Sequence, residues 1–336
     1  MRIWIDLANS PHVPFFRALI NRFNALDHEV EVTARDFAET VPLATAAQLS
    51  PQVVGVHGGR PITAKAGNLM GRAWSLANWA RARKFDLAVS HNSYSQILAA
   101  KVLRVKSVTL MDYEYQPANH LAFRFTSKII VPSCFPERRL RRYGAHPRKV
   151  RRYQGTKEDV YLSEFQCDPS FASRLSQLGI HPDNILVVMR PPAHDALYHR
   201  FQNTLFDEAL NSLLANKKVR IILLPRNTEQ RSQYQERANL IIPPEPLPGP
   251  DLLAASDLVI SAGGTINREA AALGVPVVSL YAGKWAAVDE QLVQEGRLKR
   301  ISKSQEIRDL PLTKKDNLNP RRSMSVIDEV VRMIFE

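Results

Sequence analysis

The sequence predicts an α/β protein of two domains, each built on a parallel β-sheet with helices on both faces. Short apolar runs alternate with segments of helical spacing in both halves of the chain, which is typical of such sheets. The chain has 336 residues, more than one ordinary hydrophobic core accommodates. Residues 153–183 interrupt the alternation, so we expect the crossing between the domains there.

The first half begins the alternating series directly at the N-terminus. In an open parallel sheet, ligands bind in the turns that follow the strands, so we expect a ligand near 7–12, 57–61, 91–95 or 112–116. The strands are predicted at 2–6, 29–33, 51–56, 86–90, 106–111 and 128–132, and the helices at 12–27, 63–83, 93–104 and 117–127.

The second half starts a new series at residue 184. Its tail, from about residue 320 to 336, is amphipathic and predicts a helix. The strands of this half are predicted at 184–189, 219–224, 239–242, 257–260 and 276–280.

Composition favours a cytoplasmic protein. Hydrophobic residues make up 45% of the chain, and no apolar run approaches the roughly 20 residues of a membrane span. The N-terminus lacks the pattern of a secretory signal. Cys134 and Cys167 are far apart in sequence and are expected to be reduced thiols. No cluster of cysteine and histidine has metal-ligand spacing, so no metal site is predicted.

The formal net charge of +12 is concentrated in one block with few acidic residues. This block has three interpretations: a solvated helix face, a surface that meets anionic lipid or an anionic substrate, or an RNA-binding patch. We rank nucleic acid last, because no aromatic residues are interleaved as a stacking platform. Peripheral association with the inner face of a membrane stays open. The block consists of Arg138, Arg139, Arg141, Arg142, Arg148, Lys149, Arg151 and Arg152.

The most informative segment is 256–280, which reads as strand, glycine turn, helix and strand. Gly263 and Gly264 directly follow the first strand, so the N-terminus of the next helix points its backbone N–H groups at the carboxyl edge of the sheet. Such an arrangement binds an anion, typically a phosphate, and glycines let the ligand approach the backbone closely. Glu269 falls about one turn into the helix, where its carboxylate can accept hydrogen bonds from a ribose diol.

The pattern S-x-G-G-x-x-x-x-E-A-x-x-x-G-x-P-V in this segment resembles the nucleotide-sugar half-site of GT-B-fold proteins. Two relatives are the peptidoglycan N-acetylglucosaminyltransferase and the UDP-N-acetylglucosamine 2-epimerase. The resemblance implies two Rossmann-like domains facing each other across a cleft. It implies that Gly263, Gly264 and Thr265 hold the diphosphate and that Glu269 holds the ribose hydroxyls. It further implies an N-terminal acceptor domain at 1–160, a nucleotide-sugar domain at 161–318, and a C-terminal helix at 319–336 that packs back on the first domain.

Other donor-side candidates lie at strand ends of the second domain. Arg190 ends one strand, where its guanidinium can clamp the diphosphate and stabilise the leaving group. Arg226 and Asn227 follow the next strand as phosphate or base contacts. Asp289 lies where GT-B transferases often hold sugar hydroxyls with an acidic residue and glutamine.

The loop after the first strand carries the acceptor-side candidates. Asn9 and Ser10 precede the helix, and Ser10 is expected to cap it. The H-x-P element at His12 resembles the corresponding loop of the peptidoglycan transferase, which suggests that His12 faces the cleft. A histidine there can act as a base near neutral pH, or it can simply cap or pack. Asp6, at the end of the strand, is a second candidate base, although such a carboxylate is as often structural.

Two later loops separate the transferase from the epimerase. The catalytic aspartate of the epimerase falls at Asn92, and an amide cannot transfer a proton in that role. The loop of Asp112 and Glu114 matches a loop that carries a glutamate in both relatives, so either carboxylate could line the cleft. A further glutamate of the epimerase has no counterpart here.

Across nearly the whole chain, the sequence looks like an uncharacterised prokaryotic family of GT-B-like proteins with D-x-x-x-x-P-H-V-x-F-F, D-Y-E, R-P-P and G-G-T-x-x-R-E-A motifs. We therefore expect a metal-independent glycosyltransferase that needs no cofactor beyond its UDP-sugar substrate and acts on a glycan, polysaccharide or lipid-linked acceptor. The alternatives are a UDP-N-acetylhexosamine 2-epimerase and a non-catalytic GT-B scaffold that binds a nucleotide or polyanion.

Overall fold

The computed structural model describes residues 1–37, 39–56, 62–192, 204–234, 237–321 and 325–336. The chain divides into two compact units. The first comprises Met1–Tyr161, Ala286–Val288 and Ser323–Glu336, and the second comprises Leu162–Trp285 and Asp289–Arg322. Each unit has its own parallel sheet and its own hydrophobic core.

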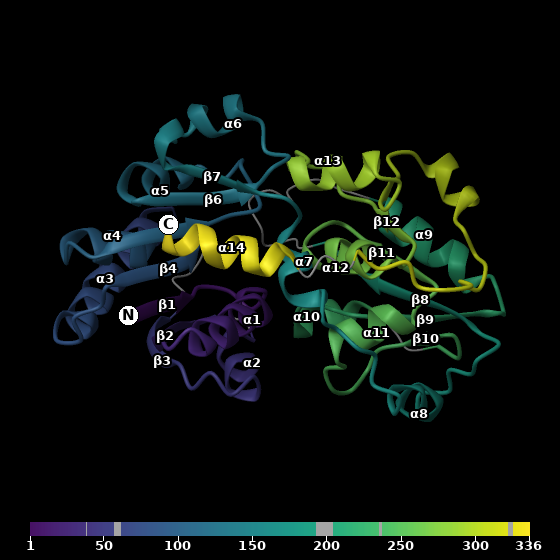
Figure 1. Cartoon of the computed structure of the whole chain (residues 1–336). Coiled ribbons are helices and arrows are strands. Elements are labelled where there is room, and N and C mark those ends of the chain that lie inside the picture. Colours follow the sequence, from purple (N-terminus) through teal and green to yellow (C-terminus); the bar gives the residue numbers. More distant parts are fainter. Residues whose placement is uncertain (38, 57–61, 193–203, 235–236, 322–324) are drawn as a thin grey trace. The chain divides into compact units, whose positions relative to one another are not determined.

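The sheet of the first unit has the strand order β3-β2-β1-β4-β5-β6-β7, and every neighbouring pair is parallel (Figure 1). The carboxyl ends of its strands therefore lie along one edge, where the turns that follow them come together. The strands are β1 (Arg2–Leu7), β2 (Glu29–Asp36), β3 (Gln52–Val56), β4 (Leu87–His91), β5 (Lys106–Leu110), β6 (Lys128–Pro132) and β7 (Val150–Tyr153).

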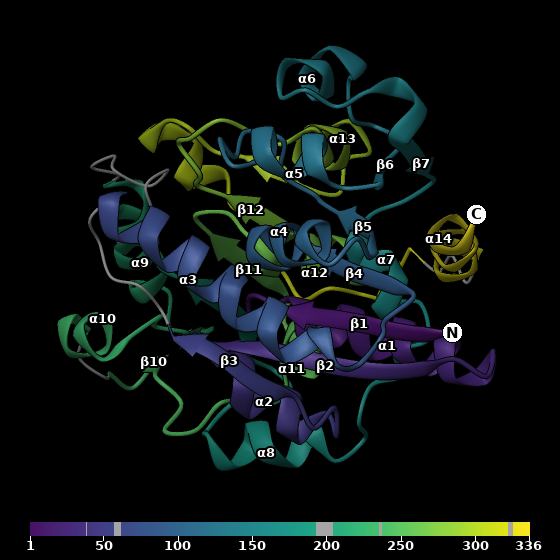
Figure 2. The same cartoon turned by 90° about the vertical axis from the view of Figure 1, so that its left-hand side faces the viewer.

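Alternate residues of β1 pack on opposite faces of this sheet. Ile3, Ile5 and Leu7 join the core under α1 (His12–Ala25), α2 (Thr40–Ala46) and α14 (Ser325–Phe335). Trp4 joins the other core, under α3 (Ile62–Arg81) and α4 (Tyr94–Val102) (Figure 2). The remaining elements of this unit are α5 (Asn119–Phe125), α6 (Glu137–Arg142), the 3-10 helix η1 (Pro147–Lys149) and α7 (Lys157–Leu162), whose last residue belongs to the second unit.

The C-terminal helix α14 belongs to the core of the first unit. Its apolar side chains, including Val330 and Ile334, are buried against α1 and the sheet. Lys128 on β6 donates from Nζ to the carbonyl of Met333 at 2.7 Å and to that of Ile334 at 3.2 Å. A cation on the last carbonyls of a helix complements both the unsatisfied acceptors and the helix dipole.

The second unit has the strand order β10-β9-β8-β11-β12-β13, again parallel throughout. One face packs on α9 (Leu205–Leu214) and the 3-10 helix η2 (Ser304–Asp309). The helix α11 (Gly249–Ala255) packs on β8, and α12 (Thr265–Leu273) packs on β11 and β12. The helix α8 (Phe171–Gln177) packs on α11. Also present are β8 (Ile185–Arg190), β9 (Val219–Leu223), β10 (Leu240–Ile241), β11 (Leu258–Ser261), β12 (Val277–Ser279), β13 (Lys299–Arg300), α10 (Thr228–Gln233) and α13 (Ala287–Gln294).

The predicted α/β class with two parallel sheets is confirmed. Two strands were not predicted, β7 and β13, because their Arg- and Lys-containing segments lack an apolar run. The predicted cap of α1 was wrong. Pro11 occupies the N-cap position and no side chain caps the helix, while the Ser10 hydroxyl lies 3.4 Å from that of Thr40.

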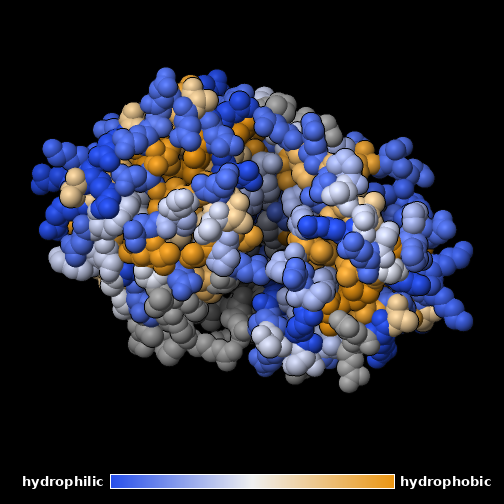
Figure 3. Space-filling model, turned by 90° about the horizontal axis from the view of Figure 1, so that it is seen from below, coloured by the Kyte–Doolittle hydropathy of each residue, from blue (hydrophilic) through white to orange (hydrophobic). Residues whose placement is uncertain are grey.

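Hydrophilic residues cover most of the face drawn in Figure 3, and hydrophobic areas lie between them. Large hydrophobic side chains with more than half of their surface exposed include Met70 and Trp74 on α3 and Val102 on α4. Within the described part of the chain, no helix has the length and apolar character needed to cross a membrane.

Candidate functional site

Residues 262–264, here called the glycine turn, connect β11 to α12 in the second unit. Gly263 has a φ of +93° and Gly264 a φ of +98°, a region that favours glycine. A Cβ on Gly263 would lie 3.1 Å from the side chain of Tyr281, whereas a Cβ on Gly264 would meet no atom within 4 Å. Gly264 is also exposed, so a ligand can approach the backbone there.

The helix α12 begins at the glycine turn without a side-chain cap. The N–H of Asn267 donates to the carbonyl of Gly264 at 3.3 Å, and no side chain caps the N–H groups before it, where the helix dipole favours an anion. The hydroxyl of Ser261 donates to Oδ1 of Asn267 at 2.8 Å and fixes the start of the helix. Thr265, the first helical residue, and Glu269, just over one turn later, are both half-buried.

Arg190 lies beside the glycine turn. It ends β8 and pairs in register with Ser261, the last residue of β11. Arg226 and Asn227 lie in the segment between β9 and α10, and Arg226 braces the turn that follows Arg190. Arg226 donates from Nε to the carbonyl of Pro191 at 2.9 Å. Asn227 accepts the N–H of Gln230 at 2.8 Å and caps α10, so it has a structural role here, and its predicted role as a phosphate or base contact stays a prediction.

Asp289 is engaged within the protein. Both of its carboxylate oxygens accept from Arg268, at 2.7 Å from Nε and 3.0 Å from the second guanidinium nitrogen. Arg268 is buried on α12, so this bidentate pair joins α12 to α13. The predicted role of Asp289 in holding a sugar hydroxyl is therefore disfavoured, because its acceptors already have a charged donor.

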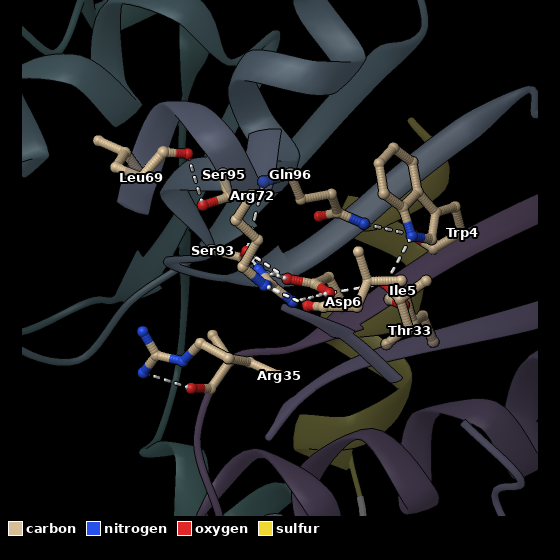
Figure 4. A network of polar contacts seen from close by, with 12 residues as sticks. Trp4, Ile5, Asp6, Thr33, Arg35, Leu69, Arg72, Ser93, Ser95 and Gln96 are labelled. Atoms are coloured by element: carbon tan, nitrogen blue, oxygen red, sulfur yellow. Dashed lines mark hydrogen bonds and ion pairs between the residues drawn. The ribbon is translucent and has the colours of Figure 1, made fainter. Parts of the chain in front are cut away.

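In the first unit, Asp6 is the centre of a buried network (Figure 4). Arg72 on α3 donates to its two oxygens at 2.7 and 2.8 Å, Thr33 donates at 2.6 Å, and Ser93 also donates. Burial alone would raise the pKa of Asp6, but the charge and hydrogen bonds of Arg72 outweigh it and the pKa lies below its ordinary value. Asp6 thus holds β1 to α3, to β2 and to the start of α4, and a carboxylate so engaged is unsuited to be a base.

The loop after β1 places His12 at the start of α1. Asn9 accepts the N–H of Ser10 on its side-chain oxygen and the N–H of His12 on its carbonyl, each at 3.0 Å. Asn9 and Ser10 thus shape the loop that carries the histidine. His12 is 9% exposed, and its Nδ1 has no hydrogen-bond partner among the residues that the structure describes.

His12 and three other titratable side chains, His91, Asp112 and Lys157, lie together at the carboxyl edge of the sheet. The ring of His91, the last residue of β4, lies 4.9 Å from that of His12. Nε2 of His91 lies 3.8 Å from Oδ1 of Asp112, and Nζ of Lys157 lies 2.8 Å from Oδ2 of Asp112. Burial holds the pKa of His12 well below its ordinary value, and the charges of His91 and Lys157 lower it further. His12 is therefore a neutral imidazole near pH 7.

Sequence reasoning predicted His12 and Asp112 but missed His91 and Lys157. The segment 157–159 reads as a solvated run of charges, yet Lys157 is 4% exposed and Glu158 and Asp159 are buried. One available signal was position: these residues follow Gly155 and Thr156 directly after β7, at the same sheet edge as the other strand ends. Because β7 was not predicted, that signal could not be used.

Glu114 and Asn92 lie around a third side chain, Asn119. Asn119 accepts from Nδ2 of Asn92 at 3.2 Å and donates to the carbonyl of Glu114 at 3.1 Å. The carboxylate of Glu114 is buried and accepts from Arg139 at 2.7 Å and from the N–H of Ala287, which belongs to the same unit, at 3.1 Å. Burial raises its pKa despite these donors.

The predicted ligand turn at 57–61 lies outside the described residues. The other three predicted turns of the first unit contribute to the groups above: 7–12 carries His12, 91–95 carries His91 and Asn92, and 112–116 carries Asp112 and Glu114. Nowhere in the described part of the chain do three or more His, Cys, Asp or Glu side chains gather in a way that could hold a metal ion.

Solved structures with the same architecture include nucleotide-sugar enzymes. The UDP-GlcNAc 2-epimerase of Methanocaldococcus jannaschii, in complex with UDP-GlcNAc and UDP, is 14% identical with a TM-score of 0.75, covering 100% of this chain and 99% of that one. HepE of Anabaena, in complex with UDP-glucose, is 19% identical with a TM-score of 0.64, covering 92% and 88%. The spinosyn rhamnosyltransferase SpnG is 14% identical with a TM-score of 0.60, covering 100% and 92%. These likenesses confirm the GT-B fold.

In sequence, the chain is 28% identical over 343 residues to an uncharacterized protein of Methanocaldococcus jannaschii, covering 99% of this chain and 96% of that protein. The profile of the family described as "Protein of unknown function (DUF354)" matches residues 1–336. The chain therefore belongs to the DUF354 family.

Proposed function

We propose that this protein is a glycosyltransferase that moves a sugar from a UDP-activated donor to an acceptor hydroxyl. The observation that supports it most is the glycine turn, which is open at Gly264, begins an uncapped helix and has Arg190 beside it in register. Backbone N–H groups, a helix dipole and a guanidinium together suit a diphosphate. Solved GT-B-fold neighbours carry UDP-GlcNAc and UDP-glucose in their complexes, which is consistent with a UDP-sugar donor here.

On the donor side, the glycine turn and Thr265 would bind the diphosphate and Glu269 the ribose hydroxyls. Arg190 would stabilise the negative charge that develops on UDP as it leaves, a task that a divalent cation performs in other enzymes. The reaction we propose is therefore metal-independent and needs no cofactor. The donor sugar that we favour is an N-acetylhexosamine, and the acceptor is a glycan, a polysaccharide or a glycolipid precursor.

On the acceptor side, His12 would act as the base. The acceptor oxygen forms a bond to the anomeric carbon of the donor, and the bond from that carbon to the UDP oxygen breaks, with its electrons going to UDP. The proton of the acceptor hydroxyl goes to the His12 imidazole, which is neutral and therefore able to accept it. Nδ1 is buried, so Nε2 is the nitrogen that would receive the proton.

The main alternative is a UDP-N-acetylhexosamine 2-epimerase, because several solved neighbours with this fold are UDP-GlcNAc 2-epimerases. Epimerisation at C2 requires acid and base groups at the carbon. Asn92 stands where the resemblance places one of them, and its amide is held by Asn119. We therefore favour transfer. A non-catalytic UDP-binding scaffold would share the donor site but release no UDP from a UDP-sugar.

Isothermal titration calorimetry with UDP tests the donor site. We expect saturable binding to the wild-type protein and at least about tenfold weaker binding to Gly264→Val, whose side chain fills the open space above the turn. Gly179→Val is the matched control. Gly179 also has a positive φ, and a Cβ there would likewise meet no atom within 4 Å, but it lies just beyond α8. Absence of UDP binding, or equal loss in both variants, would contradict the donor assignment.

A further inference from the structure

The Lys157–Asp112 ion pair lies near His12 and is largely enclosed by the protein. Lys157 is 4% and Asp112 14% exposed at the side chain, and their charged atoms lie 2.8 Å apart. An ion pair removed from water interacts over longer distances than an exposed one, because less solvent screens it. Whether both partners of the pair are present and charged therefore affects the protonation of the two nearby histidines.

The pair lies in a continuous line of side chains that crosses the sheet edge. Lys157 comes from α7 and Asp112 from the loop after β5, while His91 comes from β4 and His12 from the start of α1. Lys157 lies 2.8 Å from Asp112, and Asp112 lies 3.8 Å from His91. The ring centres of His91 and His12 are 4.9 Å apart. Four separate elements thus converge on one line, which ends at the proposed base.

We propose that Lys157, by pairing with Asp112 beside His91, prevents the Asp112 carboxylate from stabilising a protonated His12, and so keeps this buried histidine a proton acceptor at neutral pH. This inference rests on the proposed function for the role of His12 as the base. The effect of the three neighbouring side chains on the charge of His12 can be measured without it. Lys157, Asp112 and His91 are positioning residues in this account, and none of them takes the proton from the acceptor.

The sign of each charge decides whether it favours the protonated or the neutral form of His12. An unpaired Asp112 carboxylate would stabilise the protonated form of the histidines. A His12 that is already protonated could not take the proton of the acceptor hydroxyl. Lys157 cancels that charge at 2.8 Å, and Glu158, whose Oε1 lies 3.7 Å from Nζ of Lys157, moderates the lysine. Arg35, at the end of β2, is the other charged group that acts on His12, and it also disfavours the imidazolium.

Histidine titration by NMR tests this proposal without a substrate. The ring signals of His12, assigned by their loss in His12→Gln, are followed from pH 4 to 9 in the wild-type protein, Lys157→Met, Asp112→Asn and the double variant. Removing the cation should raise the pKa of His12 by roughly one pH unit, the lower end of the range for an opposite charge, because the Asp112 carboxylate lies against His91 and not directly against His12. The double variant removes both charges and should return the pKa toward the wild-type value.

Lys149→Met is the matched control. Lys149 lies in the same unit and donates from Nζ to the carbonyls of Arg124 and Thr126, so its loss removes a lysine that is not part of the line. It should leave the titration of His12 unchanged. Lys157→Arg keeps the charge and should also keep the wild-type titration. It further provides a test in case the methionine variant does not fold.

The proposal would be overturned if His12 titrated alike in the wild-type protein, Lys157→Met and the double variant. It would also be overturned if Lys157→Arg shifted the titration as much as Lys157→Met does. Failure of the proposed function is recognised separately, because UDP binding is measured in the second unit by calorimetry. A protein without UDP binding but with the expected titrations would retain the ion-pair effect and lose the transferase assignment.

Discussion

Arg72 on α3 donates two hydrogen bonds to Asp6 at the end of β1, at 2.7 and 2.8 Å, and both side chains are buried. Removing one partner of a buried pair leaves the other charge uncompensated, which typically costs about 3–5 kcal/mol. We expect Asp6→Asn to lose about 3 kcal/mol in the free energy of unfolding, measured by urea denaturation. Glu137→Gln, which breaks the exposed pair with Arg141, should lose less than about 0.5 kcal/mol.

The same carboxylate predicts a pH dependence of stability. The pKa of Asp6 is lower in the folded state than in the unfolded state, so its contribution is present above the unfolded value of about 3.9. That contribution falls as the pH drops through the folded pKa. The stability difference between the wild-type protein and Asp6→Asn should therefore narrow in acid. A variant as stable as wild type at pH 7 would contradict the structural role of Asp6.

Glu114 predicts the opposite dependence. Burial raises its pKa, so folding disfavours the ionised form and the penalty grows as the pH rises from the unfolded value through the folded one. Glu114→Gln removes this penalty and keeps an acceptor for Arg139. Thermal melts should show the variant at least as stable as wild type at pH 8, with a smaller difference at pH 4.5. An equal loss of stability at both values would count against this account.

Glu269 predicts selectivity for ribose. A carboxylate that accepts hydrogen bonds from a diol contributes roughly 1.5–3 kcal/mol, which corresponds to at least about tenfold in affinity. In calorimetry the wild-type protein should bind UDP more tightly than 2′-deoxy-UDP, and Glu269→Ala should bind the two alike. Asp183→Ala, an exposed carboxylate just before β8 in the same unit, should keep the discrimination. Unchanged discrimination in Glu269→Ala would place the ribose elsewhere.

The basic block predicts binding to anionic vesicles. Arg138, Arg142 and Arg148 are exposed and have no carboxylate partner among the described residues. Near an anionic surface each basic side chain contributes about 1 kcal/mol, so replacing all three by glutamine should weaken sedimentation with phosphatidylglycerol vesicles roughly a hundredfold. The control replaces Arg174, Lys217 and Lys218, exposed residues of the second unit. Equal effects of the two triple variants would indicate a solvated surface.

Most of the fold could be predicted from the sequence, because apolar runs and glycine turns are local signals, whereas β7 and β13 lack an apolar run. The segment around Gly263 and Gly264 predicted a strand, a tight turn and a helix, and the structure has all three with positive φ at both glycines. Asp6 was ambiguous in sequence, because only the fold brings Arg72 to it from 66 residues away.

The environment of His12 could not be predicted, because it depends on charged residues that become buried only in the folded chain. Lys157 reads as a surface residue in the sequence, but its side chain is buried in the structure. Likewise, Asp289 reads as a free loop carboxylate until α12 brings Arg268 to it. Burial and pairing of charges over long sequence separations leave no local pattern.

The central claim is that a UDP-sugar bound at the glycine turn is cleaved by transfer rather than epimerised. Its most direct test is incubation of the protein with UDP-N-acetylglucosamine in deuterated water, followed by NMR of the sugar and of released UDP. We predict slow release of UDP, carried by transfer to water in the absence of an acceptor, with no deuterium at C2 of the sugar. Deuterium at C2 with formation of the C2 epimer would contradict the account.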